Sequence, residues 1–470
     1  MLNLKLMAVS HSAHPSFDSS SEARSALLKR VARDAIDYLD EAEVRSVAPS
    51  TGAIHALSAL CGPLPPGPTN PEAVLHLLNE YGSPATIAKT SGRNFGFVNG
   101  GCLPAALAAS WMVSAWDQNA SFFVQSPVAV TLEEVALGWV VDLLGLPKGT
   151  GGAVVTGATM ANFSALAAAR HALMARAGWD VESDGLFGAP PITVVVSEEA
   201  HASVAKALGM LGMGRKRVVK VPCDDQGRMR ADAVPQLDDR TILCLQAGNV
   251  NTGAFDPAAQ ICPAARKAGA WIHVDGAFGL WAAASPARRH LTNGFELADS
   301  WATDAHKWPN LGYDCGIALV RDPEQLRGAM SMKAAYLLQG ERREPSYYNP
   351  ELSRRARGVE LWAGLRSLGR SGLAEIVERT SAHARHFAKG LKAAGFEVLN
   401  DVVINQVLVS FGSAEQTLRT ITRLQEDGTC WCGSTKWKDR TLMRISVSNW
   451  ATSEEDVERS LAAMIKAAQE

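Results

Sequence analysis

The spacing of hydrophobic residues changes along the chain. Between residues 153 and 320, short continuous apolar runs alternate with stretches in which apolar residues recur every three or four positions. A strand covered by helices on both faces reads as a continuous apolar run, so this region is predicted to form βαβ units around a largely parallel sheet. The predicted strands are Ala153–Thr156, Ile192–Val196, Val218–Val221, Thr241–Gln246, Trp271–Val274, Ser300–Thr303 and Gly316–Val320.

The segments before this region are predicted to be mainly helical. Apolar residues recur at helical spacing from Ser21 to about Ser58, and a further helix is predicted from Ser126 to about Gly145. Between these two helices, residues 61–71 contain five prolines and two glycines, which neither a helix nor a central strand tolerates. These residues are therefore predicted to separate an N-terminal arm from the main body of the chain.

The C-terminal part is predicted to be a smaller α+β domain. Strands are predicted near Val402–Phe411 and Leu442–Val447, and Thr452 with Glu455 predicts a capping box for the last helix. The whole chain is then predicted to have four parts. These are an N-terminal helical arm (1–90), a large α/β domain (91–335), a mobile lid (336–357) and a small C-terminal α+β domain (358–470).

Composition narrows the class of protein. Of the 470 residues, 47% are hydrophobic and 20% are charged, which excludes a disordered chain. The net charge of −2 provides no basic field for nucleic acid or an anionic membrane, so a small molecule is the expected partner. The eight cysteines form no CxxC pair, so no metal site is expected. With no apolar run long enough to span a membrane, a cytoplasmic enzyme is expected.

Two ionisable residues directly follow predicted strands. Lys307 lies in the sequence Thr-Asp-Ala-His-Lys-Trp after one strand, and Asp275 lies at the end of another. In open α/β sheets, ligands bind beyond the carboxyl ends of the strands. Taken alone, such a lysine is most often a surface residue, and such an aspartate is most often a helix cap or half of a buried ion pair. A buried aspartate could also pair with a pyridinium nitrogen.

Three further polar clusters follow other predicted strands. Thr156–Asn162 runs through small residues into a helix, where backbone N–H groups and the Thr159 hydroxyl could bind phosphate. His201 follows the strand that ends at Val196, and a histidine there can lie flat on an aromatic ring. Gln246–Gly253 forms a polar, glycine-containing loop. A phosphate cradle, a stacking histidine, an acid for a ring nitrogen and an imine-forming lysine together match pyridoxal 5'-phosphate (PLP).

The chain resembles the PLP-dependent group II amino-acid decarboxylases, the family of aromatic-amino-acid, histidine and glutamate decarboxylases. The resemblance begins near Phe95 and is most specific over His273–Gly279, Asp299–Trp308 and Tyr313–Val320. It implies a fold of the aspartate-aminotransferase type (fold type I) and a homodimer with active sites at the interface. It further implies that the enzyme decarboxylates an L-amino acid to an amine and CO2.

The resemblance also implies roles for individual residues. Lys307 would bind the cofactor covalently, Asp275 would pair with its pyridine nitrogen, and His201 would stack on its ring. The other residues implied to bind the cofactor are Ala158, Thr159, Asn249, Ala277 and His306. Asn249 stands in a Gly-Asn-Val-Asn sequence where many relatives have Gly-Thr-Thr.

Tyr336, in the predicted lid, matches the tyrosine that returns a proton to the substrate in this family. Related aldehyde synthases have phenylalanine there, so Tyr336 favours simple decarboxylation. An aldehyde synthase, a carbon–carbon lyase and a catalytically silent PLP-binding homologue remain the alternatives. Tyr347 and Tyr348 are alternative assignments for the proton donor.

The side chain of the substrate is less clearly indicated. Several phenylalanines suggest an apolar pocket and therefore an aromatic or bulky substrate, although such residues are more often part of a core. Many relatives have other residues at the position of Arg93. Its guanidinium could instead bind an acidic side chain, which is the alternative to an aromatic or bulky substrate. Arg444 is a candidate for binding the α-carboxylate. The phenylalanines are Phe95, Phe97, Phe122 and Phe123.

Overall fold

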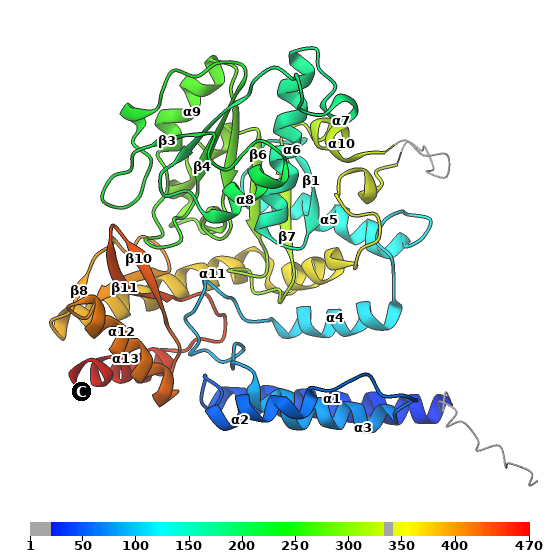
Figure 1. Ribbon diagram of the computed structural model, residues 1–470, viewed down its shortest axis with the longest axis vertical. Helices are drawn as coiled ribbons and strands as arrows, with labels where there is room; N and C mark the ends of the chain where they lie inside the picture. The colour runs from blue at the N-terminus through cyan, green and yellow to red at the C-terminus, as the bar shows by residue number, and fades with distance from the viewer. Residues whose placement is uncertain (1–19, 333–341) are drawn as a thin grey trace, which may run out of the picture. The chain divides into compact units, whose positions relative to one another are not determined.

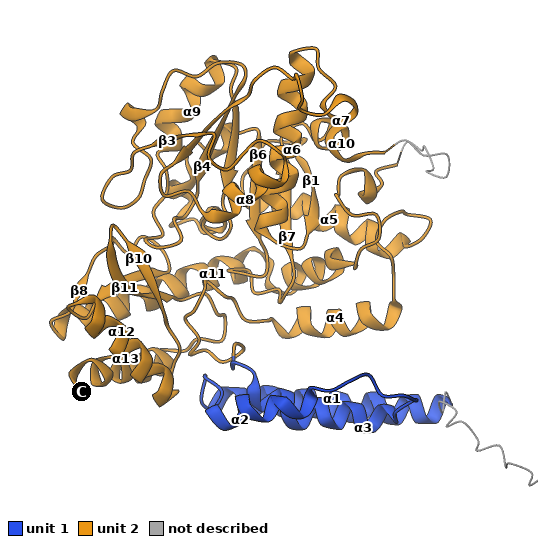
Figure 2. Cartoon of the chain, viewed as in Figure 1, with its two compact units in different colours: residues 1–88 blue, residues 89–470 orange. Residues whose placement is uncertain are grey.

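The computed structural model describes residues 20–332 and 342–470. The chain divides into two compact units, residues 1–88 and residues 89–470 (Figure 2). The first unit contains helices α1 (Ser21–Val44), α2 (Thr51–Ala56) and α3 (Pro71–Leu77). The stretch predicted as helical from Ser21 to about Ser58 is divided into separate helices, because α1 ends before Pro49, and Ser50 then caps α2 by accepting a hydrogen bond from the amide of Ala53.

The second unit is built on a seven-stranded sheet with the order β1-β7-β6-β5-β4-β2-β3 (Figure 1). Strand β7 is antiparallel to β1 and β6, and the other pairs are parallel. All seven predicted strands are confirmed to within two residues. The strands are β1 (Gly151–Val155), β2 (Thr193–Ser197), β3 (Val218–Val221), β4 (Thr241–Gln246), β5 (Trp271–Asp275), β6 (Ser300–Asp304) and β7 (Gly316–Val320).

Helices cover both faces of this sheet, as the continuous apolar runs predicted. Alternate residues along each strand belong to different apolar clusters, so that Val154 packs on one face and Val155 on the other. The first face is covered by α5 (Pro127–Leu143), α9 (Ala258–Lys267) and α11 (Arg357–Ala393). The second is covered by α6 (Ala158–Arg176), α8 (Ala202–Met210) and α10 (Pro323–Met330). Helix α4 (Pro104–Trp116) packs against α11.

The C-terminal part contains an antiparallel sheet with the order β10-β11-β9-β8. Helices α12 (Ala414–Asp427) and α13 (Glu454–Gln469) pack against it through one apolar cluster. The predicted capping box is wrong by one residue, because Ser453 and Asp456 form it instead of Thr452 and Glu455. The four strands are β8 (Glu397–Val398), β9 (Gln406–Ser410), β10 (Gly433–Trp437) and β11 (Arg440–Ser446).

A buried ion pair ties the segment before α11 to the central sheet. Arg354 Nη2 lies 2.6 Å from Glu133 Oε2 on α5, and neither side chain is exposed to solvent. Arg354 Nη1 also donates to the carbonyl of Val154 on β1 (3.1 Å). Removal of one partner would leave an uncompensated buried charge.

We therefore expect Arg354→Met to lower the stability of the protein by about 3 kcal/mol, because the buried Glu133 would keep only the more distant guanidinium of Arg343, whose Nη1 lies 4.0 Å from Glu133 Oε1. The measurement is the thermal or urea unfolding midpoint of the purified chain. A matched double variant, Glu133→Leu with Arg354→Met, should recover most of the loss because it removes both charges. Equal midpoints for the single variant and the unchanged protein would contradict the importance of this pair.

Candidate active site

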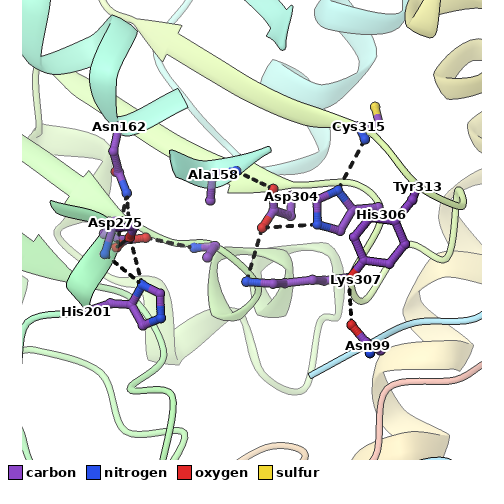
Figure 3. Close-up of polar contacts among 12 residues, drawn as sticks. Asn99, Ala158, Asn162, His201, Asp275, Asp304, His306, Lys307, Tyr313 and Cys315 are labelled. Atoms are coloured by element: carbon purple, nitrogen blue, oxygen red, sulfur yellow. Dashed lines mark hydrogen bonds and ion pairs between the residues drawn. The ribbon is translucent and has the colours of Figure 1, made fainter. Parts of the chain in front are cut away.

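The carboxyl ends of five strands meet at one edge of the central sheet. Strands β2, β4, β5 and β6 are parallel, and β1 has the same direction because β7 is antiparallel to both β1 and β6. The five polar clusters found in the sequence follow these five strands. Figure 3 shows that residues from four of them, Ala158, His201, Asp275 and Lys307, lie in one region.

Lys307 forms an ion pair with an acid that precedes it by three residues. Its Nζ lies 3.1 Å from Asp304 Oδ2 at the end of β6 (Figure 3), and its side chain is 18% exposed. The other carboxylate oxygen, Asp304 Oδ1, accepts a hydrogen bond from the amide of Ala158 (2.5 Å). Asp304 therefore connects the start of α6 to the lysine.

Asp275 is held by a chain of buried hydrogen bonds. Asn162 on α6 donates through Nδ2 to Asp275 Oδ2 (3.3 Å), and its Oδ1 accepts from His273 Nε2 (2.8 Å). His273 Nδ1 lies 3.0 Å from the Ser300 hydroxyl, and burial lowers the pKa of His273 to about 4. His273 is therefore neutral at pH 7 and fixes the orientation of Asn162. Asp275 Oδ1 accepts from the amide of Ala277 (3.3 Å).

His201 is the N-cap residue of α8. Its Nδ1 accepts a hydrogen bond from the amide of Ser203 (3.2 Å). The hydroxyl of the same serine lies 3.4 Å from Asp275 Oδ2. His201 keeps part of its surface exposed to solvent, but burial of the imidazole lowers its pKa. Desolvation has the largest effect on the pKa of His201, Asp275 raises it, and Lys307 and Arg444 lower it, so these three charges lie within electrostatic range of the imidazole.

The start of α6 offers backbone donors to an anion. Ala158 N already contacts a carboxylate oxygen, and Ala161 N donates to the carbonyl of Gly157. The N–H groups of Thr159 and Met160 belong to the same first turn, where a helix has amides without intrahelical partners. Since the amide of Ala158 is already bound to Asp304, the next amides of this 19-residue helix are the ones that remain for a phosphate group.

His306 lies between this helix start and an aromatic ring. Its Nδ1 accepts from the amide of Cys315 (3.2 Å), and its Nε2 lies 3.6 Å from Asp304 Oδ2. Burial lowers the pKa of His306, so the ring is neutral at pH 7. The ring stacks on Tyr313 with the centroids 4.3 Å apart, and the Tyr313 hydroxyl donates to Asn99 Oδ1 (2.5 Å; Figure 3).

Other candidates from the sequence have different surroundings. Asn249 is buried, and its carboxamide bonds Gln246, Asn251 and Thr252 within its own loop. Arg93 is also buried and donates to the carbonyl of Thr429 (2.5 Å).

Two of the four phenylalanines pack against other aromatic rings of the chain. Of the three tyrosines considered as proton donors, two are buried. Phe95 packs edge-on against Phe387 in the C-terminal core, and Phe122 packs against Tyr347, which is buried with Tyr348. Tyr336 lies outside the described residues.

The sequence interpretation missed several residues of this region. The sequence gives no clear indication of a role for Asp304, Asn162, Ser203 or Tyr313. Only the position of Asp304, three residues before Lys307, was a usable signal, since an acid so close to a buried lysine is an expected partner.

Comparisons with known proteins agree with this geometry. The protein-family model described as the pyridoxal-dependent decarboxylase conserved domain matches residues 87–412 of this chain. Aromatic-L-amino-acid decarboxylase of Drosophila lebanonensis is 30% identical over 378 residues, which cover 74% of this chain and 91% of the relative. Acidic amino acid decarboxylase GADL1 of Mus musculus is 31% identical over 314 residues, 63% of this chain and 55% of the relative.

A solved structure is similar over almost the whole chain. The crystal structure of Oryza sativa TDC with PLP and tryptamine superposes with a TM-score of 0.87 at 23% identity, covering 96% of this chain and 99% of the other. The chain belongs to the pyridoxal-dependent decarboxylase family. It is a PLP-dependent carboxy-lyase that acts on an amino acid, with the fold predicted from the sequence.

None of the helices in residues 20–332 and 342–470 is long and apolar enough to span a membrane. Over the same residues, no group of three or more His, Cys, Asp or Glu side chains is placed to hold a metal ion.

We expect Asn162→Leu to weaken PLP binding by about tenfold and to lower the unfolding midpoint, because His273 and Asp275 would each lose a buried hydrogen-bond partner. Spectroscopic titration of the cofactor-free protein with PLP measures the first effect. Ser164→Ala is a matched control on the same helix, since the Ser164 hydroxyl is buried without a partner among the described residues. Identical behaviour of the two variants would contradict the role of Asn162.

Proposed function

We propose that Lys307, Asp275 and His201 are the catalytic residues of this decarboxylase. The observation that carries the proposal is their convergence at one edge of the sheet, where Asp275 and Lys307 both act on the pKa of His201. PLP, when bound, supplies an acceptor for the electron pair that remains when the substrate carboxylate leaves as CO2. Lys307 would hold the cofactor, and the imidazole of His201 would stack on its ring.

Asp275 would keep the cofactor nitrogen protonated. Its two oxygens are oriented by Ala277 and Asn162, so that the carboxylate is fixed before the cofactor arrives. The phosphate would bind at Ala158, Thr159 and His306, around the start of α6. Asn249 was also predicted to bind the cofactor. Because its carboxamide is already hydrogen-bonded within its own loop, we propose that it acts on the cofactor only by shaping that loop.

After CO2 leaves, a proton must be added to the former α-carbon. We propose Tyr336 as the donor, on the resemblance alone. Tyr347 and Tyr348 are buried beside the central domain, which makes them poorer candidates for a group that must approach the substrate. An aldehyde synthase would consume O2 and release hydrogen peroxide, so the two reactions differ in a measurable product.

We propose an L-amino acid with an aromatic side chain as the substrate. Phe97 stacks on Trp431 with the ring centroids 5.3 Å apart, and it lies three residues before Gly100, which packs against the backbone of Lys307. An aromatic surface therefore borders the site, and relatives named for aromatic substrates support the choice. Arg93 does not support an acidic substrate, since its guanidinium is bound to the C-terminal part.

Arg444 on β11 is the proposed partner of the substrate α-carboxylate. Burial lowers its pKa, and none of the described carboxylates forms an ion pair with it. Its hydrogen bond to Asn251 Oδ1 is long, at 3.5 Å. A guanidinium with so little compensation, within electrostatic range of His201, is suited to an anionic ligand.

We also propose that the enzyme is a cytoplasmic homodimer with its active sites at the subunit interface. The resemblance to the decarboxylase family supports the dimer. Eight cysteines, all described and all unpaired, are consistent with a reducing compartment.

We expect Lys307→Ala to abolish CO2 release from L-amino acids and to remove the visible absorbance of bound PLP, because the covalent attachment is lost. Lys206→Ala, on the exposed face of α8, is the matched control and should behave as the unchanged protein. CO2 and hydrogen peroxide are followed together, and CO2 without peroxide is the expected result. Retention of turnover by Lys307→Ala would rule out the assignment.

For Asp275→Asn, we expect kcat to fall by about a hundredfold or more while the unfolding midpoint changes little, since asparagine has the same shape but no charge to hold a proton on the cofactor nitrogen. Steady-state CO2 assays and thermal unfolding are the measurements. A loss confined to KM would instead indicate that Asp275 only positions the cofactor.

A further inference from the structure

Lys89 lies close to the residues around Lys307. Its Nζ is 3.6 Å from the centroid of the Tyr313 ring, and that ring stacks on His306, the residue before Lys307. Lys89 also contributes to lowering the pKa of His306, which places its charge within electrostatic range of the site. A cation on the face of an aromatic ring is stabilised by the ring but still has N–H groups to donate.

None of the described carboxylates forms an ion pair with Lys89, and burial lowers its pKa to about 8. The acids nearby already have cationic partners within 3.1 Å, so their charges are compensated without Lys89. These pairs are Glu360 with Arg355 (2.9 Å), Asp304 with Lys307 (3.1 Å) and Asp314 with Arg357 (2.6 Å). Lys89 is therefore a half-buried cation available for an added acceptor.

A cavity of about 220 Å³ lies at Lys89. Leu107, Leu311 and Tyr313 form apolar parts of its wall, and Thr90 also lines it. The Thr90 hydroxyl is buried without a hydrogen-bond partner among the described residues. Carbon atoms of a ligand would contact the apolar wall, while Lys89 and Thr90 would bind an oxygen atom.

The cavity adjoins the backbone at Lys307. Gly101 lines it, and a Cβ added to the preceding residue, Gly100, would lie 2.0 Å from the carbonyl oxygen of Lys307. Gly100 and Gly101 therefore bring the wall of the cavity into contact with the backbone of Lys307.

We propose that Lys89, together with Thr90, determines substrate specificity by binding an oxygen acceptor at the far end of the substrate side chain. The proposal rests on the proposed decarboxylase function and refines the class of substrate. The acceptor could be the ring hydroxyl of a tyrosine-like substrate or the carboxylate of an acidic one. The apolar walls favour the ring hydroxyl.

The test compares matched amino acids that differ in this oxygen. For the unchanged holoenzyme, kcat/KM should be higher for L-tyrosine than for L-phenylalanine. Lys89→Met should reduce this ratio by about 10- to 100-fold, the effect of losing one hydrogen bond to a charged group. Lys89→Arg should keep most of it, and Lys148→Met, a change at an exposed lysine, should leave the ratio unchanged.

A second pair, L-glutamate and L-norvaline, identifies the source of the acceptor. If only the glutamate preference exists and Lys89→Met removes it, Lys89 recognises a side-chain carboxylate and the aromatic assignment is wrong. If Lys89→Met leaves the ratio of kcat/KM values unchanged within both pairs, the proposal is overturned.

Failure of the proposed function can be told apart from failure of this inference. If the holoenzyme releases CO2 from none of these amino acids, the proposed function fails. Binding of 3-(4-hydroxyphenyl)propionate and 3-phenylpropionate, measured by calorimetry, then tests Lys89 without turnover. Lys89→Met should bring the two dissociation constants together, and an unchanged difference would refute the role of Lys89.

Discussion

The active site depends on two carboxylates buried at one edge of the sheet. Asp275 is 4% exposed and Asp304 is 2% exposed, and an ionised carboxylate in such surroundings is stable only if hydrogen bonds or cations compensate it. Helix α6 supplies partners to both. Asn162 donates to Asp275, and the amide of Ala158 donates to Asp304. The position of this helix against β5 and β6 is therefore set by charge as well as by packing.

The strands were predictable because their environment is visible in local sequence. A strand with helices on both faces must be apolar at nearly every position, and the runs from Thr241 and Trp271 have this property. Their directions then brought Asp275, His201 and Lys307 together without further information. The edge strand β10 is not predicted because Gly433–Trp437 reads Gly-Ser-Thr-Lys-Trp, with three consecutive polar residues and one large apolar residue at its end.

The partners of these residues were harder to predict, because their role exists only in the folded chain. Asn162 is one polar residue in an alanine-rich helix, and it matters because His273 and Asp275, more than a hundred residues away in sequence, meet it. Arg93 shows the opposite case. Its position near the substrate segment suggested a ligand, whereas in the folded chain it is bound by the carbonyl of Thr429 and approached by Asp456. Sequence identifies charge, but only tertiary contacts show whether that charge is already compensated.

The pairing of Lys307 with Asp304 has a consequence for Asp275. A lysine amine 3.1 Å from one carboxylate has its charge largely compensated there, and Asp304 is in turn fixed by the start of α6. Asp275 forms its own hydrogen bonds with the amide of Ala277 and with Asn162, and its charge is not matched by an ion pair among the described residues. Each acid thus has a different partner. The carboxylate of Asp275, which has no cation among the described residues, is therefore the one that we propose for the protonated ring nitrogen, and the amine of Lys307, held by Asp304, is the one that we propose for the bond to the cofactor.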